Sequence, residues 1–143
     1  MADIAYSIKE ISLADCLPIR QAYLWPSLTQ EECVTDGDKN ATHFGVFVGD
    51  KLSGCASFHH LEGHKKRIRR VAVSPEYRGQ GLGSALLKHA MEKLVTPDLT
   101  EIWLNARLPA QNFYRRLGFE TMGETFFERD VQEIRMVKKY PVE

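Results

Sequence analysis

The sequence predicts a mixed α/β fold. In the middle of the chain, short apolar runs alternate with amphipathic stretches of helical spacing, and pairs of strands stand towards both ends. With 143 residues, of which 43% are hydrophobic, the chain is long enough to bury a core and most simply forms one domain over residues 1–143. No repeat, low-complexity tract or linker divides it.

The first sixty residues predict a strand, a helical region and a hairpin. Pro18 and Trp25-Pro26 interrupt the helical region, because proline supplies no backbone N–H. The segment Gly49-Asp50-Lys51 is a tight-turn sequence between two strands. The expected elements are a strand at 4–10, a helical region at about 13–35, and strands at Phe44–Val48 and Leu52–His59.

The remaining residues predict alternating strands and helices that close on two strands. Apolar side chains recur with helical spacing over 80–95, and Pro97 ends that helix. Pro109 suits the first turn of a second helix, and Gly118 suits its C-terminal cap. The expected elements are a strand at Val71-Ala72-Val73, a helix at 80–95, a strand at Ile102–Leu104, a helix from Pro109 to Leu117, and strands near 119–127 and 133–138.

Composition and charge exclude several classes of protein. The 19 basic and 19 acidic residues give a formal net charge of +0, so no overall field attracts nucleic acid or an anionic membrane. The cysteines, Cys16, Cys33 and Cys55, are odd in number and widely spaced, which favours reduced thiols. Because there is neither a signal-peptide pattern nor a long apolar run, we expect a soluble, cytoplasmic protein with no membrane partner.

Three glycines stand where the helix at 80–95 begins, namely Gly79, Gly81 and Gly83. Glycine weakens a helix by roughly 0.5–1 kcal/mol relative to alanine, so bare backbone must be needed there. A strand, a tight turn and a helix N-terminus together present unpaired N–H groups and the positive end of the helix dipole. With Arg78 and Gln80 as side-chain donors, the segment predicts a diphosphate-binding site.

This glycine pattern differs from two common phosphate-binding motifs. No Lys-Ser or Lys-Thr follows it, as the P-loop requires. Ser84 stands where the dinucleotide-binding fingerprint needs its last glycine. Taken alone, the glycines also fit a turn that lets a strand and a helix pack closely.

Two segments carry a family resemblance. The segment YRGQGLG resembles motif A of the GNAT acetyltransferase superfamily, whose core R/Q-x-x-G-x-G/A corresponds to Arg78, Gly81 and Gly83. The segment from Ala110 to Phe119 resembles a second GNAT element, A-x-x-F/L-Y-x-x-x-G-F, and it follows at the family's usual spacing. Its matching residues are Ala110, Phe113, Tyr114, Gly118 and Phe119.

The resemblance implies both a fold and an activity. A GNAT-like fold has a mixed, mostly antiparallel central sheet of six to seven strands, with splayed parallel middle strands and flanking helices. The implied activity is an acetyl-CoA-dependent N-acetyltransferase reaction, in which a primary amine of a small molecule or peptide attacks the thioester directly in a ternary complex. Acetyl-CoA is then the co-substrate, and we expect a monomer or a homodimer.

The resemblance also assigns residues to acetyl-CoA. The pyrophosphate is expected on the motif A amides, and the pantetheine arm pairs with the strand Val71–Val73 like an added strand. Asn105 resembles an asparagine that touches pantetheine, although Ala110 follows at a longer spacing than usual, and a turn role is the alternative. The residues expected to bind the cofactor are Val71, Ala72, Val73, Arg78, Gly79, Gln80, Gly81, Leu82, Gly83, Ser84, Asn105 and Asn112.

Tyr114 matches the general-acid position of the family. A phenol near the sulfur donates a proton or a hydrogen bond to the departing thiolate. The alternative is a core aromatic residue whose hydroxyl is satisfied elsewhere.

The general base is less clearly marked. Many GNAT proteins use a glutamate on the strand before motif A, where this chain has arginines. The closing segment resembles a GNAT branch with F-x-E-x-G-I-x-H, in which Glu133 replaces the histidine. Glu133 is therefore the expected base, with His59 and His60 as other candidates, and a surface carboxylate paired with Arg135 or a lysine is the alternative.

The basic run Lys65–Arg70 is short and lies in a neutral chain. It favours a solvated strand face, or a rim that attracts the 3′-phosphate of CoA, over nucleic-acid binding. The histidine spacings predict no metal site. Two other functions stay open, a non-catalytic acyl-CoA-binding regulator and a nucleic-acid-binding module, and no motif defines the acceptor, whose specificity is expected in residues 11–40.

Overall fold

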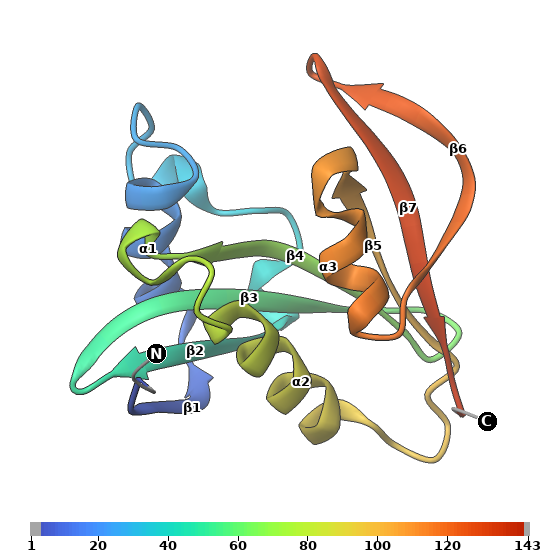
Figure 1. The fold of residues 1–143 in the computed structure, drawn as a ribbon, viewed down its shortest axis with the longest axis horizontal. Coiled ribbons are helices and arrows are strands. Elements are labelled where there is room, and N and C mark those ends of the chain that lie inside the picture. The colour runs from blue at the N-terminus through green and yellow to red at the C-terminus, as the bar shows by residue number, and fades with distance from the viewer. Residues whose placement is uncertain (1–3, 142–143) are drawn as a thin grey trace. The chain divides into compact units, whose positions relative to one another are not determined.

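The computed structural model, which describes residues 4–141, confirms the mixed α/β prediction (Figure 1). Seven strands form one sheet in the order β1-β2-β3-β4-β5-β7-β6. Its strands are β1 (Tyr6–Ile11), β2 (Thr42–Val48), β3 (Lys51–Leu61), β4 (Lys65–Val73), β5 (Glu101–Arg107), β6 (Glu120–Glu128) and β7 (Val131–Lys139). The α-helices are α1 (Leu13–Tyr23), α2 (Leu82–Leu94) and α3 (Gln111–Arg116). Short 3-10 helices are η1 (Glu31–Cys33), η2 (Asp38–Asn40), η3 (Pro75–Tyr77) and η4 (Leu108–Ala110).

The sheet is mostly antiparallel, as the resemblance implies. β1 pairs with β2, β2 with β3, β5 with β7 and β6 with β7, all in antiparallel fashion. β4 and β5 are parallel, with Lys65–Arg67 opposite Glu101–Trp103. A parallel pair in the middle of an antiparallel sheet confirms the expected fold class.

The chain divides into two compact units. The first runs up to His59 and includes Arg69–Leu94, and the second contains His60–Ile68 and the residues from Val95 onwards. The glycine turn and the strand Val71–Val73 therefore belong to the first unit, and Tyr114 and Glu133 belong to the second. The expectation of one domain over residues 1–143 stays a prediction.

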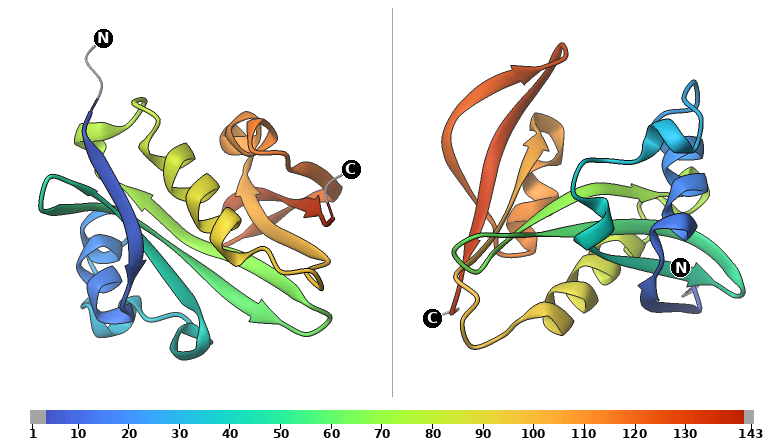
Figure 2. Two further views of the ribbon diagram at one scale, coloured as in Figure 1. Left: turned by 90° about the horizontal axis from the view of Figure 1, so that it is seen from below. Right: turned by 180° about the vertical axis from the view of Figure 1, so that it is seen from behind.

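In the first unit, α1 and α2 lie on opposite faces of the strands (Figure 2). On the α1 face, Cys16 and Ile19 pack with Cys55 and Ala72 in one buried cluster. On the α2 face, the centre of the Phe44 ring lies 6.2 Å from that of Phe58 and 6.4 Å from that of His89. The helical spacing predicted for 80–95 is confirmed, because α2 buries Leu82, Leu86, Leu87, Ala90 and Met91.

The N-terminal helix is shorter than expected. Ser12 begins α1 with a capping box, in which Ser12 and Asp15 exchange side-chain to backbone hydrogen bonds of 3.1 and 3.2 Å. The helix continues through Pro18 but ends at Tyr23, because Pro26 lacks an N–H and restricts the residue before it. Residues 24–41 form a loop that contains η1 and η2 instead of helix.

In the second unit, β5 is longer than the predicted strand Ile102–Leu104. Its full register with β7 runs from Glu101 opposite Lys139 to Arg107 opposite Glu133. The register between β6 and β7 shifts between Met122 and Phe126, where Gly123 has φ of +80°. The two closing strands otherwise agree with the prediction.

Candidate functional site

The glycine turn, residues 78–84, adopts backbone that favours glycine. Gly79 has φ of +78° and Gly81 has φ of +84°, both in the left-handed region. A Cβ added at either position would meet no atom within 4 Å. The space beside these two residues is therefore open, so close packing against the strand does not explain the glycines.

The turn also presents the hydrogen-bond donors that the sequence predicts. The N–H of Ala85 donates to the carbonyl of Gly81 at 3.0 Å, which is the first bond of α2. The N–H groups of Leu82, Gly83 and Ser84 precede it and have no partner inside the helix. Arg78 and Gln80 are exposed next to them. These groups lie together at the positive end of the helix, an arrangement that suits an anion, while Arg78 Nε and Gln80 Nε2 donate to the carbonyls of Val73 and Glu76 at 3.4 and 3.3 Å.

Arg70, directly before the strand Val71–Val73, has an unusual backbone. Its φ of +57° lies in the left-handed region, which costs energy for a residue with a side chain. Its Nε donates to Oγ1 of Thr35 at 2.8 Å, and its Cζ lies 4.7 Å from the ring centre of Trp25. The loop after α1 therefore holds the strained residue of β4.

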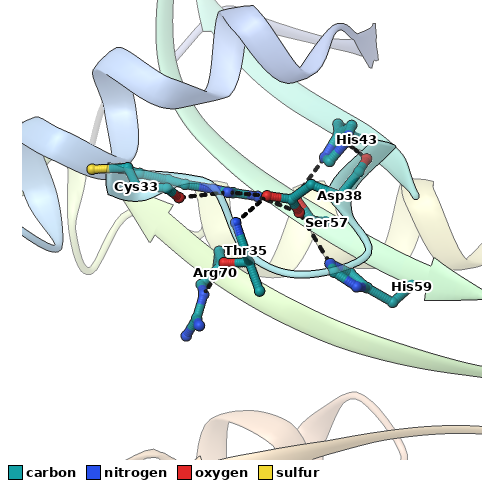
Figure 3. Close-up of polar contacts among 8 residues, drawn as sticks. Cys33, Thr35, Asp38, His43, Ser57, His59 and Arg70 are labelled. Carbon is teal, nitrogen blue, oxygen red and sulfur yellow. Dashed lines mark hydrogen bonds and ion pairs between the residues drawn. The ribbon is translucent and has the colours of Figure 1, made fainter. Parts of the chain in front are cut away.

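The loop after α1 is itself held in place by a buried ion pair (Figure 3). Arg20 of α1 and Asp38 of η2 are completely or almost completely buried. Nη1 of Arg20 donates to Oδ2 of Asp38 at 2.6 Å, and Nη2 donates to Oδ1 at 3.1 Å. Arg20 also donates to the carbonyl of Cys33 and to Oγ of Ser57, both at 2.9 Å. This bidentate geometry compensates for the cost of burying both charges.

Two histidines join the same network (Figure 3). Nε2 of His59 lies 3.1 Å from Oδ1 of Asp38. His43 contacts Oγ of Ser57 at 2.6 Å through Nδ1 and the Asp38 carbonyl at 3.0 Å through Nε2. Burial opposes ionisation of Asp38, but hydrogen bonds from His59, Arg20 and Thr35 outweigh it and hold the pKa of that carboxyl well below its usual range. Asp38 is therefore an anion inside the first unit.

His60, the other histidine candidate, lies in a different environment. It is exposed, and its Nδ1 lies 2.9 Å from Nζ of Lys66. Successive residues of a strand point to opposite faces of the sheet. Only His59 of the two histidines is therefore held by the buried network.

Tyr114 lies on α3 in the second unit. It is 9% exposed. The centre of its ring lies 5.0 Å from that of Phe113 and 6.0 Å from that of Phe119, and both pairs pack edge to face. Burial raises the pKa of Tyr114 to about 12. The hydroxyl therefore stays protonated at neutral pH and is able to donate a hydrogen bond.

Three further predicted residues lie in the second unit. Asn105 sits on β5, and its Oδ1 is buried without a hydrogen-bond partner among residues 4–141. Asn112 is exposed on α3. Glu133 is half-buried on β7, opposite Arg107 of β5 and Phe126 of β6.

Part of the basic run packs on aromatic rings instead of facing only solvent. Cζ of Arg67 lies 4.6 Å from the ring centre of Trp103, and Cζ of Arg135 lies 4.0 Å from the same ring. β4 and β7, which carry these arginines, are the two strands that flank β5. Cation–π contacts therefore stabilise this face of the second unit.

Other kinds of site are not evident in the described part of the chain. A hollow of about 480 Å³ in the second unit is lined by Arg115, Gly118, Phe119, Glu120 and Thr121, none of which is a predicted site residue. Within residues 4–141, no group of three or more histidine, cysteine or acidic side chains is placed to hold a metal ion. No helix in that range has the length and apolar character needed to cross a membrane.

Comparison with known proteins decides the family. The sequence profile of the acetyltransferase (GNAT) family matches residues 5–119, which include the whole glycine turn. The chain belongs to the GNAT family. Both GNAT motifs of the sequence fall in the matched range, and the predicted family is confirmed.

Individual GNAT relatives agree in sequence and fold. The chain is 35% identical over 127 residues to the uncharacterized N-acetyltransferase YitI of Bacillus subtilis (strain 168), covering 83% of this chain and 85% of YitI. Its fold resembles the ribosomal-protein-S18-alanine N-acetyltransferase of Escherichia coli, with a TM-score of 0.79, 21% identity, and 97% and 96% of the two chains covered. A GNAT acetyltransferase of Elizabethkingia anophelis, solved with acetyl-CoA bound, gives a TM-score of 0.74 at 15% identity, covering 94% of this chain and 97% of that one.

No motif in the sequence of this GNAT protein marks the buried network. Arg20 and Asp38 are 18 residues apart and carry no motif, so each reads as a surface charge. The only hint is that Gly37, just after the helical region predicted at about 13–35, precedes Asp38, which favours a turn there.

Proposed function

We propose that this GNAT protein transfers an acetyl group from acetyl-CoA to the primary amine of a small molecule or peptide. The observation that carries the proposal is the glycine turn, with its left-handed Gly79 and Gly81 before a helix N-terminus, inside the segment that the family profile matches. Acetyl-CoA bound to a neighbour of the same fold supports the choice of co-substrate.

The residues present fit acetyl-CoA. The open space beside Gly79 and Gly81 leaves room for a pyrophosphate against the backbone amides of the turn. The buried Oδ1 of Asn105 lacks a donor within the described chain, and an amide N–H of a pantetheine arm would supply one. We therefore assign the pyrophosphate to residues 78–84, the pantetheine arm to Val71–Val73 and Asn105, and an outer contact to Asn112.

Acetyl-CoA supplies an acetyl group activated as a thioester, which an amine attacks directly in a ternary complex. The protein orients the thioester carbonyl through a backbone N–H of Val71–Val73. It also removes a proton from the amine and assists protonation of the departing thiolate. A thiol has a pKa of about 8.5, so a phenol with a pKa of about 12 does not give up its proton completely to the departing thiolate. Tyr114 therefore stabilises that thiolate as a hydrogen-bond donor.

Glu133 stays the carboxylate candidate for the general base. Its half-buried position on β7 makes it accessible to a ligand at the surface of the second unit. His59 is the other candidate that the structure places in a defined environment.

Substitution of Gly81 by aspartate is expected to lower the affinity for CoA by at least about tenfold, or 1.4 kcal/mol. The new carboxylate would occupy the open space beside the turn and repel the diphosphate, and the left-handed backbone would be strained. Calorimetric titration with CoA measures this loss. Gly123→Asp is the matched control, because Gly123 also has positive φ and open space but lies on β6. Unchanged CoA affinity in a folded Gly81→Asp variant would show that the pyrophosphate does not bind at residues 78–84.

Acetyl-CoA is expected to raise the melting temperature, because it binds only the folded protein. At one hundred times its dissociation constant, the stabilisation is about 2.7 kcal/mol. NAD shares the diphosphate but lacks a pantetheine arm to pair with Val71–Val73, so it should give a smaller shift. A thermal melt at matched ligand concentrations makes the comparison, and an equal shift with NAD would contradict the ligand assignment.

The activity itself is tested with a panel of primary amines that contains amino acids, polyamines, aminoglycosides and peptides with free N-termini. Each is mixed with acetyl-CoA and the protein, and release of the CoA thiol is followed. Amine-dependent release supports the transferase. Binding of CoA without turnover of any amine would favour the non-catalytic acyl-CoA-binding regulator.

A further inference from the structure

In the buried network, His59 has a ring nitrogen, Nδ1, that no hydrogen bond from the described residues occupies. We propose that His59, oriented by Asp38, is the general base that takes the proton from the acceptor amine. This inference rests on the proposed function, and it selects His59 over Glu133. All the residues that carry it belong to the first unit, which also contains the glycine turn and the strand Val71–Val73.

The hydrogen bond to Asp38 fixes the tautomer of His59. Asp38 is ionised and can only accept, so Nε2 of His59 donates to Oδ1 at 3.1 Å. The neutral imidazole then carries its lone pair on Nδ1. Among the described residues, no hydrogen bond reaches Nδ1. A carboxylate that orients an imidazole in this way leaves the opposite nitrogen ready to accept a proton.

Gly37 leaves space beside that nitrogen. A Cβ at Gly37 would stand 3.1 Å from Nδ1 of His59 and 3.6 Å from Cε1. Gly37 has φ of +91°, a conformation in which glycine is free of strain. Gly37 therefore spares Nδ1 a contact that a Cβ would make there, and His59 keeps 5% of its surface exposed.

The network also connects His59 to the strand assigned to pantetheine. Asp38 accepts the N–H of Thr35 at 2.6 Å, and Oγ1 of Thr35 accepts Nε of Arg70 at 2.8 Å. Arg70 directly precedes Val71, whose strand is proposed to hold the thioester. Hydrogen bonds thus link the His59 ring to the backbone at that strand through Asp38, Thr35 and Arg70, all within one compact unit.

In the proposed step the acceptor nitrogen loses two protons. The acceptor enters as an ammonium ion, and one of its N–H protons passes to Nδ1 of His59, directly or through one water molecule. The freed nitrogen lone pair forms the C–N bond to the acetyl carbon while the C–S bond breaks. The sulfur leaves as a thiolate and takes up the second proton that the acylated nitrogen must lose to become an amide, directly or through water, and the imidazolium returns the first proton to solvent.

Other charged and titratable groups belong to the network of Asp38 and His43 or lie against it. They come from every element of the network, so each contributes to the pH dependence. They are Arg20 and Cys16 of α1, Cys33 of η1, Asp38 of η2, His43 of β2, Cys55 of β3 and Arg70 of β4.

His59→Gln tests the base, because the glutamine amide keeps a donor for Asp38 but has no basic nitrogen. We expect kcat/KM for the best amine of the panel to fall about a hundredfold or more. We also expect the wild-type rate to decline towards acid pH as the base is protonated, and this decline to be absent in His59→Gln. Melting temperature and calorimetric CoA affinity should stay close to wild type. His64→Gln, an exposed histidine in the turn after β3, is the control and should change nothing.

Gly37→Ala gives a second test that leaves His59 in place. Its methyl group would press on Nδ1, so kcat should fall at least tenfold while CoA affinity is kept. Gly49→Ala is the matched control, since Gly49 has φ of +60° and a Cβ there meets nothing within 4 Å. Both positions have positive φ, and only at Gly37 would the new methyl group contact the ring of His59.

The outcomes separate this inference from the proposed function. A wild-type protein that acetylates no amine of the panel would overturn both. An active wild type with full activity in His59→Gln would overturn the inference alone. The same holds if Glu133→Gln, and not His59→Gln, abolishes the acid-side decline in kcat/KM.

Discussion

Substitution of Arg20 by methionine is expected to lower the free energy of unfolding by about 3–5 kcal/mol, because it leaves the charge of Asp38 buried without its cation. Methionine fills much of the space of the arginine stem, so lost charge compensation and lost hydrogen bonds account for most of the effect. Arg20 also donates to Cys33 and Ser57, and those acceptors would lose their partner as well. Denaturation in urea with an unchanged m-value measures the loss.

Arg116→Met is the control for this change. Arg116 is exposed on α3, and its substitution should alter stability by no more than about 0.5 kcal/mol. Equal stabilities of the two variants would mean that the buried pair contributes nothing. The pH dependence adds a second readout. The pKa of Asp38 is depressed in the folded state, so its contribution is present above the unfolded pKa of about 3.9 and is lost as pH falls towards the folded pKa.

Tyr114→Phe is expected to lower kcat by roughly a hundredfold, the low end for loss of one hydrogen-bond donor to developing negative charge. The change removes one oxygen and leaves the edge-to-face contacts with Phe113 and Phe119 intact. Affinity for CoA should change little, because the diphosphate is held elsewhere. Thiol-release kinetics and calorimetry measure the two quantities.

Tyr6→Phe serves as the control, since Tyr6 is 49% exposed on β1 and has no proposed role. Preserved kcat with reduced stability in Tyr114→Phe would identify Tyr114 as a core aromatic that holds α3. A fall of only twofold to threefold would count against the proposed hydrogen bond, because solvent would then supply what the thiolate needs.

The elements that local sequence dictates were predictable. The apolar spacing of α2 places its buried leucines without knowledge of the rest of the fold. Gly118 ends α3 as predicted, with φ of +98° and with hydrogen bonds from Gly118 to Arg115 and from Phe119 to Tyr114. The glycine turn was also predictable, since left-handed backbone before a helix needs residues without Cβ.

The features that depend on distant partners were not predictable. The region after Tyr23 reads as helix, but the bonds from Arg20 to Cys33 and Asp38 hold it as a loop. β5 extends beyond its apolar centre because β7 pairs with all of it, including the polar Asn105. The roles of Asn105, Asn112, Tyr114 and Glu133 remain predictions from the family motif. His59 was one of three candidates, and only the position of Asp38 distinguishes it from His60.

The register shift in β6 has a consequence for how the protein behaves at high concentration. β6 is the last strand of the sheet, so within residues 4–141 no strand pairs with one side of its backbone. Its regular pairing with β7 is confined to Glu120–Met122 and Phe126–Glu128, with the left-handed Gly123 between them. An exposed strand recruits another chain when it offers a long, flat row of N–H and C=O groups. Here that row is broken into two pieces of three residues, each with a glutamate at its outer end, so β6 is a poor template for aggregation even though Met122 and Phe127 are exposed.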